Sequence, residues 1–351
     1  MKSAIQNTGL MILVLGICLT LLEPLSRIIL PVSNAVDTRS LSGEPLEDIY
    51  ESALRFKPGL AFRQVGNEFD VQVTISEDGH RVPTHSGNPE VIFLGDSFTF
   101  GHGLNDDETF PFIYCSKVAV TCANLGMSGT GTGWQLDILE DHLTSKNWKP
   151  RTVKLFMFAM SGALMSGNDL ADNLHYVASG GSSSVESNDS TIESDQSQRV
   201  LSIAERMILV RNAVLENSNL GRVMYHMLGP WIRTRFSPRP SEDRLNAALA
   251  ATRVQIQRFE ELARQYAFGA EIYLIHPIQD IMRGTAEDTM SRISEIAPML
   301  DVFDTAHLFG TEPQKFYYSF DGHLNSLGSL QIAGYLINQH DLFDAKRLEN
   351  R

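Results

Sequence analysis

The feature that most constrains the fold is an alternation of short apolar runs with amphipathic segments of helical length. Residues 91–95 (VIFLG) form a β-branched and aromatic run that ends in glycine, as in a strand buried on both faces. Further strands are expected in VAVTCANLG, at 152–160 and in AEIYLIHP, and the clearest helix is expected at 243–268. This alternation predicts an α/β fold with a doubly wound, mostly parallel sheet.

The N-terminus differs in composition from the rest of the chain. GLMILVLGICLTLL is uncharged, and Glu23 and Arg27 follow it. With no small-x-small cleavage site directly after the run, we expect residues 1–30 to form a signal anchor or transmembrane helix. A cleaved signal peptide and a buried helix are the alternatives. Lys2 before the run favours a cytoplasmic N-terminus, which would place the rest of the chain outside the inner membrane.

Composition divides the remaining chain into three parts. Residues 31–60, with few apolar positions, are expected to form a stalk, and residues 61–350 a single α/β domain. An insertion at 176–240 is expected to interrupt that domain. It begins with a Ser-rich, acidic stretch typical of disorder, and its second half has a basic helical pattern. That half fits a packed helical insertion, a lid or a membrane contact.

Charge and cysteine content limit the partners and the chemistry. The formal net charge of −13 disfavours nucleic acid as a partner, because phosphate binding requires clustered Lys and Arg. No Cys or His spacing indicates a metal site, and no cofactor is expected. Cys115 and Cys122 could form a disulfide or remain two buried thiols. The oligomeric state is left open.

Three residues of the types found in a serine catalytic triad each lie where a loop is expected to leave the sheet. Ser97 comes directly after the run at 91–95, and Asp321 and His323 stand in Asp-Gly-His before the terminal helix. A serine hydroxyl needs a base, and the base needs a partner that fixes its tautomer. Taken singly, each residue is more easily explained as a turn or cap residue. His102 could line the mouth of a cleft, but no partner for it is evident in the sequence.

Acyl transfer also requires donors for an oxyanion. NLGMSGTGTG follows the second predicted strand, with Gly129 in it, and Asn168 follows the third strand in GNDLADN. The alternatives are a flexible glycine turn and an Asx turn. Four such sites after successive strands indicate one shared active site.

At this point the sequence resembles the SGNH (GDSL-type) hydrolases, in particular membrane-anchored bacterial members. GDSFTFG, NLGMSG, GND and DGHLNSLG are similar to its four characteristic blocks, in order. The resemblance implies a three-layer α/β/α sandwich with a flavodoxin-like sheet. It also implies Ser97 as nucleophile, His323 and Asp321 as base and partner, and Ser97, Gly129 and Asn168 as the oxyanion hole. The spacing before Asn168 is longer than is usual for the family.

The resemblance implies a serine hydrolase that acts on ester bonds outside the inner membrane. O-acyl groups, above all O-acetyl groups on exported or cell-surface polysaccharide, are the expected substrates. The alternatives are a carbohydrate O-acyltransferase with the same triad and a lipid or lysophospholipid esterase. A non-catalytic glycan-binding factor of a polysaccharide export system is the alternative outside the enzymes.

Overall fold

The structure is a computed structural model of the 351-residue chain. It describes residues 18, 20–30, 32, 36–52, 54–83, 87–159, 168–181, 214, 217–224 and 241–349. The chain divides into two compact units. The larger unit comprises 37–185 and 237–351, and the smaller unit comprises 1–36 and 186–236.

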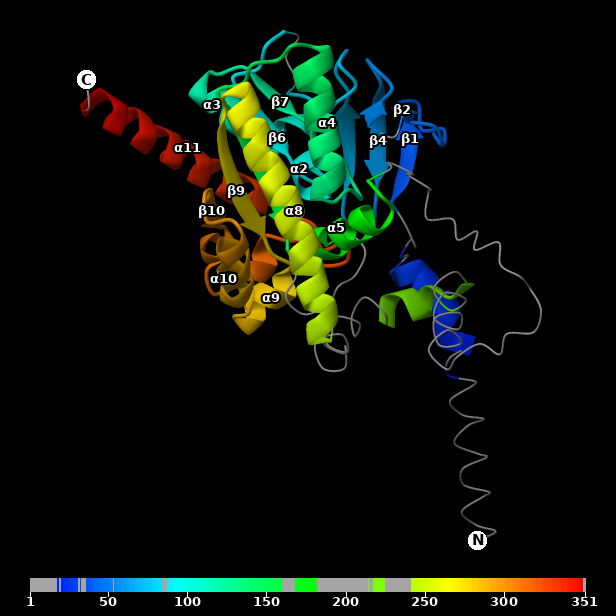
Figure 1. The fold of residues 1–351 in the computed structure, drawn as a ribbon. Helices are drawn as coiled ribbons and strands as arrows, with labels where there is room; N and C mark the ends of the chain where they lie inside the picture. The colour runs from blue at the N-terminus through cyan, green and yellow to red at the C-terminus, as the bar shows by residue number, and fades with distance from the viewer. Residues whose placement is uncertain are drawn as a thin grey trace, which may run out of the picture. The chain divides into compact units, whose positions relative to one another are not determined.

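A five-stranded parallel sheet forms the centre of the larger unit (Figure 1). Its order is β10-β9-β8-β6-β7, which in chain order is the 2-1-3-4-5 arrangement of flavodoxin-like folds. The predicted parallel sheet is therefore confirmed, together with its expected order. The strands are β6 (Val91–Leu94), β7 (Cys122–Asn124), β8 (Thr152–Phe158), β9 (Gly269–Ile275) and β10 (Asp301–Asp304).

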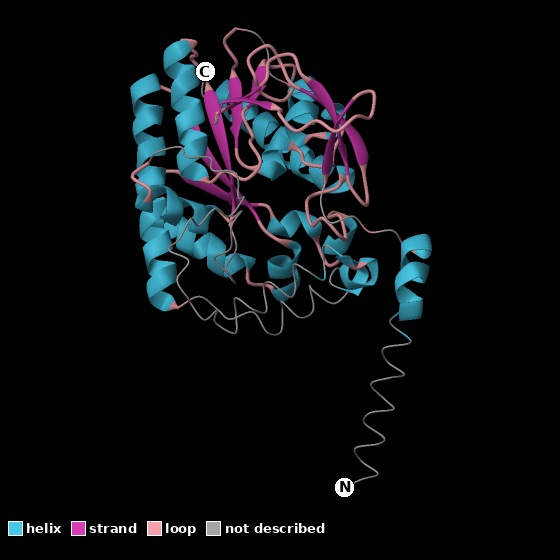
Figure 2. Cartoon of the chain, turned by 90° about the vertical axis from the view of Figure 1, so that its right-hand side faces the viewer, coloured by secondary structure: helices cyan, strands magenta, loops and turns pink. Residues whose placement is uncertain are grey.

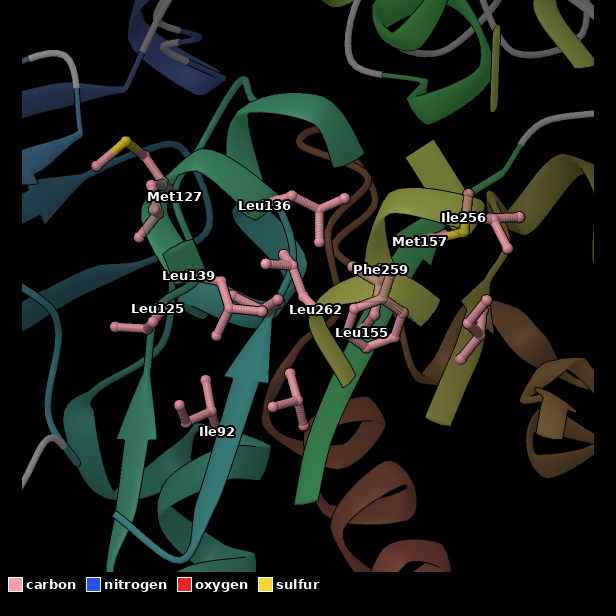
Figure 3. Close-up of a cluster of buried hydrophobic side chains, with 14 of the residues drawn as sticks. Ile92, Leu125, Met127, Leu136, Leu139, Leu155, Met157, Ile256, Phe259 and Leu262 are labelled. Atoms are coloured by element: carbon pink, nitrogen blue, oxygen red, sulfur yellow. The ribbon is translucent and has the colours of Figure 1, made fainter. Parts of the chain in front are cut away.

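Helices cover both faces of this sheet, as the uniformly apolar strands require. Ile92 and Leu94 of β6 belong to a buried cluster with side chains of α4 and α8, part of which Figure 3 shows. Phe93, which points the opposite way, belongs to a second cluster with Tyr114 of α3 and Leu336 of α11. The helices of the larger unit are α2 (Ser97–Phe100), α3 (Phe110–Val118), α4 (Thr132–Ser145), α5 (Asp169–Ala178), α8 (Glu242–Tyr266), α9 (Ile278–Arg283), α10 (Ala286–Ile296) and α11 (Ser326–Glu349).

A small antiparallel sheet precedes the parallel sheet in the chain. Its order is β1-β4-β5, and Figure 2 shows the strands of both sheets in magenta. These strands are β1 (Asp37–Ser40), β4 (Ala61–Val65) and β5 (Asp70–Thr74), while β2 (Tyr50–Ser52) and β3 (Arg55–Phe56) form a separate pair.

The segment 31–60, which was expected to form a stalk, contains β-structure from residue 37 onward. Residues 37–40 pair with 62–65 of β4, from Asp37 opposite Val65 to Ser40 opposite Phe62. The segment DTRS carries no apolar alternation, because its side chains are only partly buried or exposed. Backbone hydrogen bonds to β4, rather than hydrophobic burial, therefore hold β1 in the fold.

The predicted insertion also has different limits in the structure. Helix α5 continues to Ala178, so the domain extends past residue 176. The Ser-rich stretch and most of the basic helical stretch lie outside the described residues.

Two segments of the smaller unit that are far apart in sequence are joined by Glu23. Its carboxylate accepts hydrogen bonds from Ser218 Oγ (2.7 Å) and from the backbone N–H groups of Asn219 (2.9 Å) and Leu220 (3.0 Å). Arg27 also forms an ion pair with Glu23, at 2.9 Å.

Most of the expected anchor at 1–30 lies outside the described residues, which begin at residue 18. Within the described ranges, no helix combines the length and the apolar character needed to cross a membrane.

Cys115 and Cys122 form a disulfide between α3 and β7. The alternative of two free thiols is therefore excluded in this structure.

Candidate active site

The candidate site lies where β6 ends and the chain turns into α2. The Asp96 carboxylate accepts a hydrogen bond from Phe98 N (2.9 Å) and so caps this short helix, which starts at Ser97. The turn requires small residues around it. A Cβ on Gly95 would lie 2.1 Å from Thr99 Oγ1, and a Cβ on Gly126 would lie 2.3 Å from Phe100 N. Gly95 therefore lets the chain turn from β6 into α2, and Gly126 lets the loop after β7 approach α2.

Ser97, His323 and Asp321 are joined by hydrogen bonds, although 226 residues separate the first two. Ser97 Oγ lies 2.7 Å from His323 Nε2. His323 Nδ1 lies 2.5 Å from Asp321 Oδ1, and the backbone N–H of His323 donates to the same oxygen at 3.3 Å. This geometry matches the relation of nucleophile, base and orienting carboxylate that acyl transfer requires.

The surroundings of the triad favour an ionised Asp321 and a neutral His323. Although burial opposes ionisation of Asp321, its contacts with His102 and His323 hold the pKa of this carboxyl well below its usual range. Burial lowers the pKa of the His323 imidazole, and the Asp321 carboxylate offsets only part of that shift. A neutral imidazole can accept the Ser97 proton, as a general base must.

A second histidine lies against the same carboxylate. His102 Nε2 is 3.5 Å from Asp321 Oδ2, and the rings of His102 and His323 are tilted with centroids 4.5 Å apart. Phe98 packs on the His323 ring at 4.8 Å. The expectation that His102 lines the mouth of the cleft understated its position, because its partner Asp321 is remote in sequence.

Arg81 anchors the loop that carries His102. Its side chain is fully buried, and it donates to the carbonyl groups of Phe100 (2.9 Å), Gly101 (2.5 Å) and Leu104 (2.5 Å). It also forms an ion pair with Asp106 at 3.2 Å. Burial lowers the pKa of Arg81 to about 10, so the group stays charged at neutral pH. The sequence patterns gave no indication of this role for Arg81.

The two predicted oxyanion residues lie on neighbouring loops. Gly129 has a φ of +76° and lies in the loop after β7, which is tied to the Ser97 turn by a bond from Met127 N to Gly95 O (3.0 Å). Asn168 is buried and caps α5, where its Oδ1 accepts from Leu170 N at 3.1 Å. The Asx turn, which was the alternative interpretation of Asn168, agrees with this local role. The oxyanion role of both residues stays a prediction.

Two buried carboxyl groups flank the site, and sequence reasoning missed both. Burial and the nearby charge of Asp169 raise the pKa of Asp96 well above its usual range. Burial raises the pKa of Asp169 to about 7, although the carboxyl accepts bonds from Thr132 Oγ1 (2.7 Å) and Phe158 N (2.8 Å). These bonds fix the start of α5, and with it Asn168, against the end of β8. The sequence does place both carboxyl groups beside predicted site residues, since Asp96 precedes Ser97 and Asp169 follows Asn168.

The donor atoms of His102, Asp321 and His323 lie within 4.8 Å of one another, which within the described part of the chain is the arrangement most suited to a metal ion. In this structure, however, Asp321 and His323 are bonded to each other and His323 to Ser97. A metal ion here would compete with the triad.

No protein-family model matches the sequence, and no curated protein matches it. Solved structures with a similar fold include a protein assigned to the lipolytic G-D-S-L family from Desulfitobacterium hafniense DCB-2 (13% identity, TM-score 0.38, covering 72% of this chain and 99% of that one). A carbohydrate esterase (10% identity, TM-score 0.37) covers 89% of this chain and 84% of its own. An acetyl xylan esterase (14% identity, TM-score 0.36) covers 71% and 98%, respectively. These similarities are too remote to carry an argument about function.

Proposed function

We propose that this protein is a serine hydrolase that cleaves carboxylic esters. The observation that carries the proposal is the continuous hydrogen-bonded chain from Ser97 Oγ through the His323 ring to the Asp321 carboxylate. A turn or cap serine has no need of such a chain, whereas a serine nucleophile requires it.

The reaction follows from this arrangement in two steps. Ser97 Oγ attacks the ester carbonyl carbon while His323 Nε2 accepts the hydroxyl proton, which gives a tetrahedral oxyanion. The oxyanion collapses, the C–O bond to the alcohol breaks, and His323 returns the proton to the departing alcohol. Water then attacks the acyl-serine with the same proton transfers, which releases the acid and restores Ser97. Asp321 holds the Nδ1–H of His323 and stabilises the transient imidazolium.

The oxyanion is assigned to the backbone N–H groups of Ser97 and Gly129 and to the Asn168 amide. Two observations support the assignment. The positive φ of Gly129 turns the backbone sharply beside the Ser97 turn. Apart from its two chain neighbours, the described residues place no heavy atom within 4 Å of where its Cβ would be. Asn168 stands at the N-terminus of α5, and Asp169 beside it accepts a hydrogen bond from Phe158 N (2.8 Å) at the end of β8, at the same edge of the sheet as Ser97.

The proposed substrate is an O-acyl, above all O-acetyl, ester on exported or cell-surface carbohydrate. The side chains of His323 and Asp321 are 23% and 18% exposed to solvent. This partial exposure suits a shallow site that accepts a small acyl group on a large acceptor. The proposed location is outside the inner membrane, with residues 1–30 as anchor. The Cys115–Cys122 disulfide supports that location, because disulfides persist in oxidising compartments.

The test is the hydrolysis of p-nitrophenyl acetate by the wild type and by Ser97→Ala. Loss of the nucleophile is expected to reduce kcat by about 10⁴-fold or more. Ser116→Ala, which changes an exposed serine on α3, serves as the matched control and should retain wild-type turnover. Wild-type turnover by Ser97→Ala would contradict the proposal.

The substrate class is tested separately. Release of acetate from acetylated oligosaccharides should exceed release of long-chain acids from lysophospholipid. The reverse order would identify a lipid esterase instead.

A further inference from the structure

Glu68 lies at the tip of the β4–β5 hairpin, far in sequence from the triad, yet it binds the loop that carries Asp321. Glu68 Oε1 accepts from the backbone N–H of Ser319 at 2.7 Å. Glu68 Oε2 accepts from the N–H groups of Phe320 (2.7 Å) and Asp321 (3.1 Å). One carboxylate therefore holds three successive backbone groups, including that of the triad acid itself.

The same hairpin reaches Asp321 from its other side through His102. Gln64 Oε1 accepts from Gly103 N (3.2 Å), so the Gln64 amide presents its NH₂ group to His102 Nδ1, which is 3.4 Å away. A His102 ring that accepts at Nδ1 carries its proton on Nε2, and Nε2 faces Asp321 Oδ2 at 3.5 Å. Gln64 thus selects the tautomer that donates to Asp321.

Apolar packing fixes the hairpin tip between these two loops. The Phe69 ring, which is only 8% exposed, meets His102 edge-on with centroids 5.5 Å apart and Tyr318 at 5.2 Å. Tyr318 in turn donates its hydroxyl to Gly103 O at 2.8 Å. The loop of Ser97 and His102 and the loop of Asp321 are therefore joined at the hairpin tip.

On the basis of the proposed serine hydrolase, we propose that Glu68 is a positioning residue, which holds Asp321 where its carboxylate binds His323 Nδ1. A charged acceptor makes hydrogen bonds roughly twice as strong as neutral ones, so three of them suit a loop that must not shift. Catalytic groups tolerate displacements of only about 0.5 Å, which explains why a hairpin outside the main sheet would be recruited for this purpose.

Glu68→Gln is the variant that tests this role. Glutamine has nearly the same shape, but it replaces one accepting oxygen with an NH₂ group that faces backbone donors. We expect kcat for p-nitrophenyl acetate to fall by about 10-fold or more with little change in KM. Because contact with Asp321 raises the pKa of His323, a loosened Asp321 should also move the acid limb of the kcat/KM profile to lower pH. Glu77→Gln, at an exposed position in the turn after β5, is the control.

A purely structural role for Glu68 would lower the melting temperature and leave the acid limb where it is, and that result would overturn the proposal. An unchanged kcat and profile would also overturn it. The titration of His323 by NMR in wild type and Glu68→Gln keeps this test separate from the proposed function. If the wild type shows no Ser97-dependent turnover, the proposed function fails, while a lower pKa of His323 in the variant still supports the positioning role and an equal pKa overturns it.

Discussion

His323 is enclosed by two rings, those of Phe98 and His102, and this environment determines how the site responds to pH. Burial lowers the pKa of His323 below its ordinary value of about 6.5. The neutral, base-competent form therefore persists as the pH falls through 6.5, and the imidazole becomes protonated only at lower pH.

We predict that the acid limb of kcat/KM has its half-maximal point below pH 6.5, because the pKa of His323 is lowered. The measurement is a pH profile of kcat/KM with p-nitrophenyl acetate. A half-maximal point above pH 6.5 would contradict this environment for His323. The same pKa shift affects stability: between the folded and unfolded pKa values of His323 the unfolded chain binds more protons, so stability falls as the pH is lowered through that window.

Asn168 combines a capping role, which the structure shows, with an oxyanion role, which is proposed. The two are separable by substitution. Asn168→Ser keeps an oxygen that can cap α5 but has no amide to reach an oxyanion. Asn168→Ala removes both and should also cost about 1 kcal/mol of stability.

Both Asn168 variants are expected to lose about 10²–10³ in kcat, because one oxyanion donor contributes on that scale. Steady-state kinetics and thermal melts of the two variants give the comparison. If Asn168→Ser retained near wild-type kcat, Asn168 would be a helix cap and nothing more.

At the scale of elements, the antiparallel sheet β1-β4-β5 and the segment after it secure the site loops. Arg81 follows β5 and binds the carbonyl groups of the loop after α2, while Glu68 in the β4–β5 hairpin binds the Asp321 loop. Both anchors use charged groups on backbone partners. The parallel sheet thus supplies the edge at which the triad forms, and the N-terminal β-structure fixes its loops.

Arg81→Met should be strongly destabilising. The change leaves the Asp106 carboxylate without its buried partner. It also removes the Arg81 donor from the carbonyl groups of Phe100, Gly101 and Leu104, of which Gly101 O keeps a bond from Leu104 N. Removal of one partner of a buried ion pair costs about 3–5 kcal/mol.

Denaturant unfolding measures this loss. Arg63→Met is the matched control, since Arg63 of β4 pairs with Asp70 on an exposed surface and such pairs contribute little. Equal stability of the two variants would show that Arg81 is no anchor.

At the scale of the whole molecule, the sequence predicts the elements whose pattern is visible within a few neighbouring residues, such as the strands of the parallel sheet. Runs such as VIFLG are apolar because both faces of the strand are covered, so the parallel sheet could be predicted from them. Ser97, Asp321 and His323 could be singled out only as a set, because each residue type taken alone beside a strand or helix start also suits a turn or cap.

Contacts between remote segments could not be predicted in the same way. Glu68 and Asp321 are 253 residues apart, and the sequence around either residue does not indicate that the two are in contact. The contact between His102 and Asp321 could not be predicted for the same reason. Residues 37–40 were expected in a stalk because a strand held by backbone pairing alone leaves no apolar pattern in its sequence.

In the proposed mechanism, His323 activates Ser97 as a nucleophile. The most direct test of this step is the reaction of the folded protein with a serine-directed fluorophosphonate, followed by peptide mass mapping of the labelled residue. We predict stoichiometric labelling of Ser97, which is lost in Ser97→Ala and strongly slowed in His323→Ala. Folded wild-type protein that remains unlabelled at Ser97 would contradict the account.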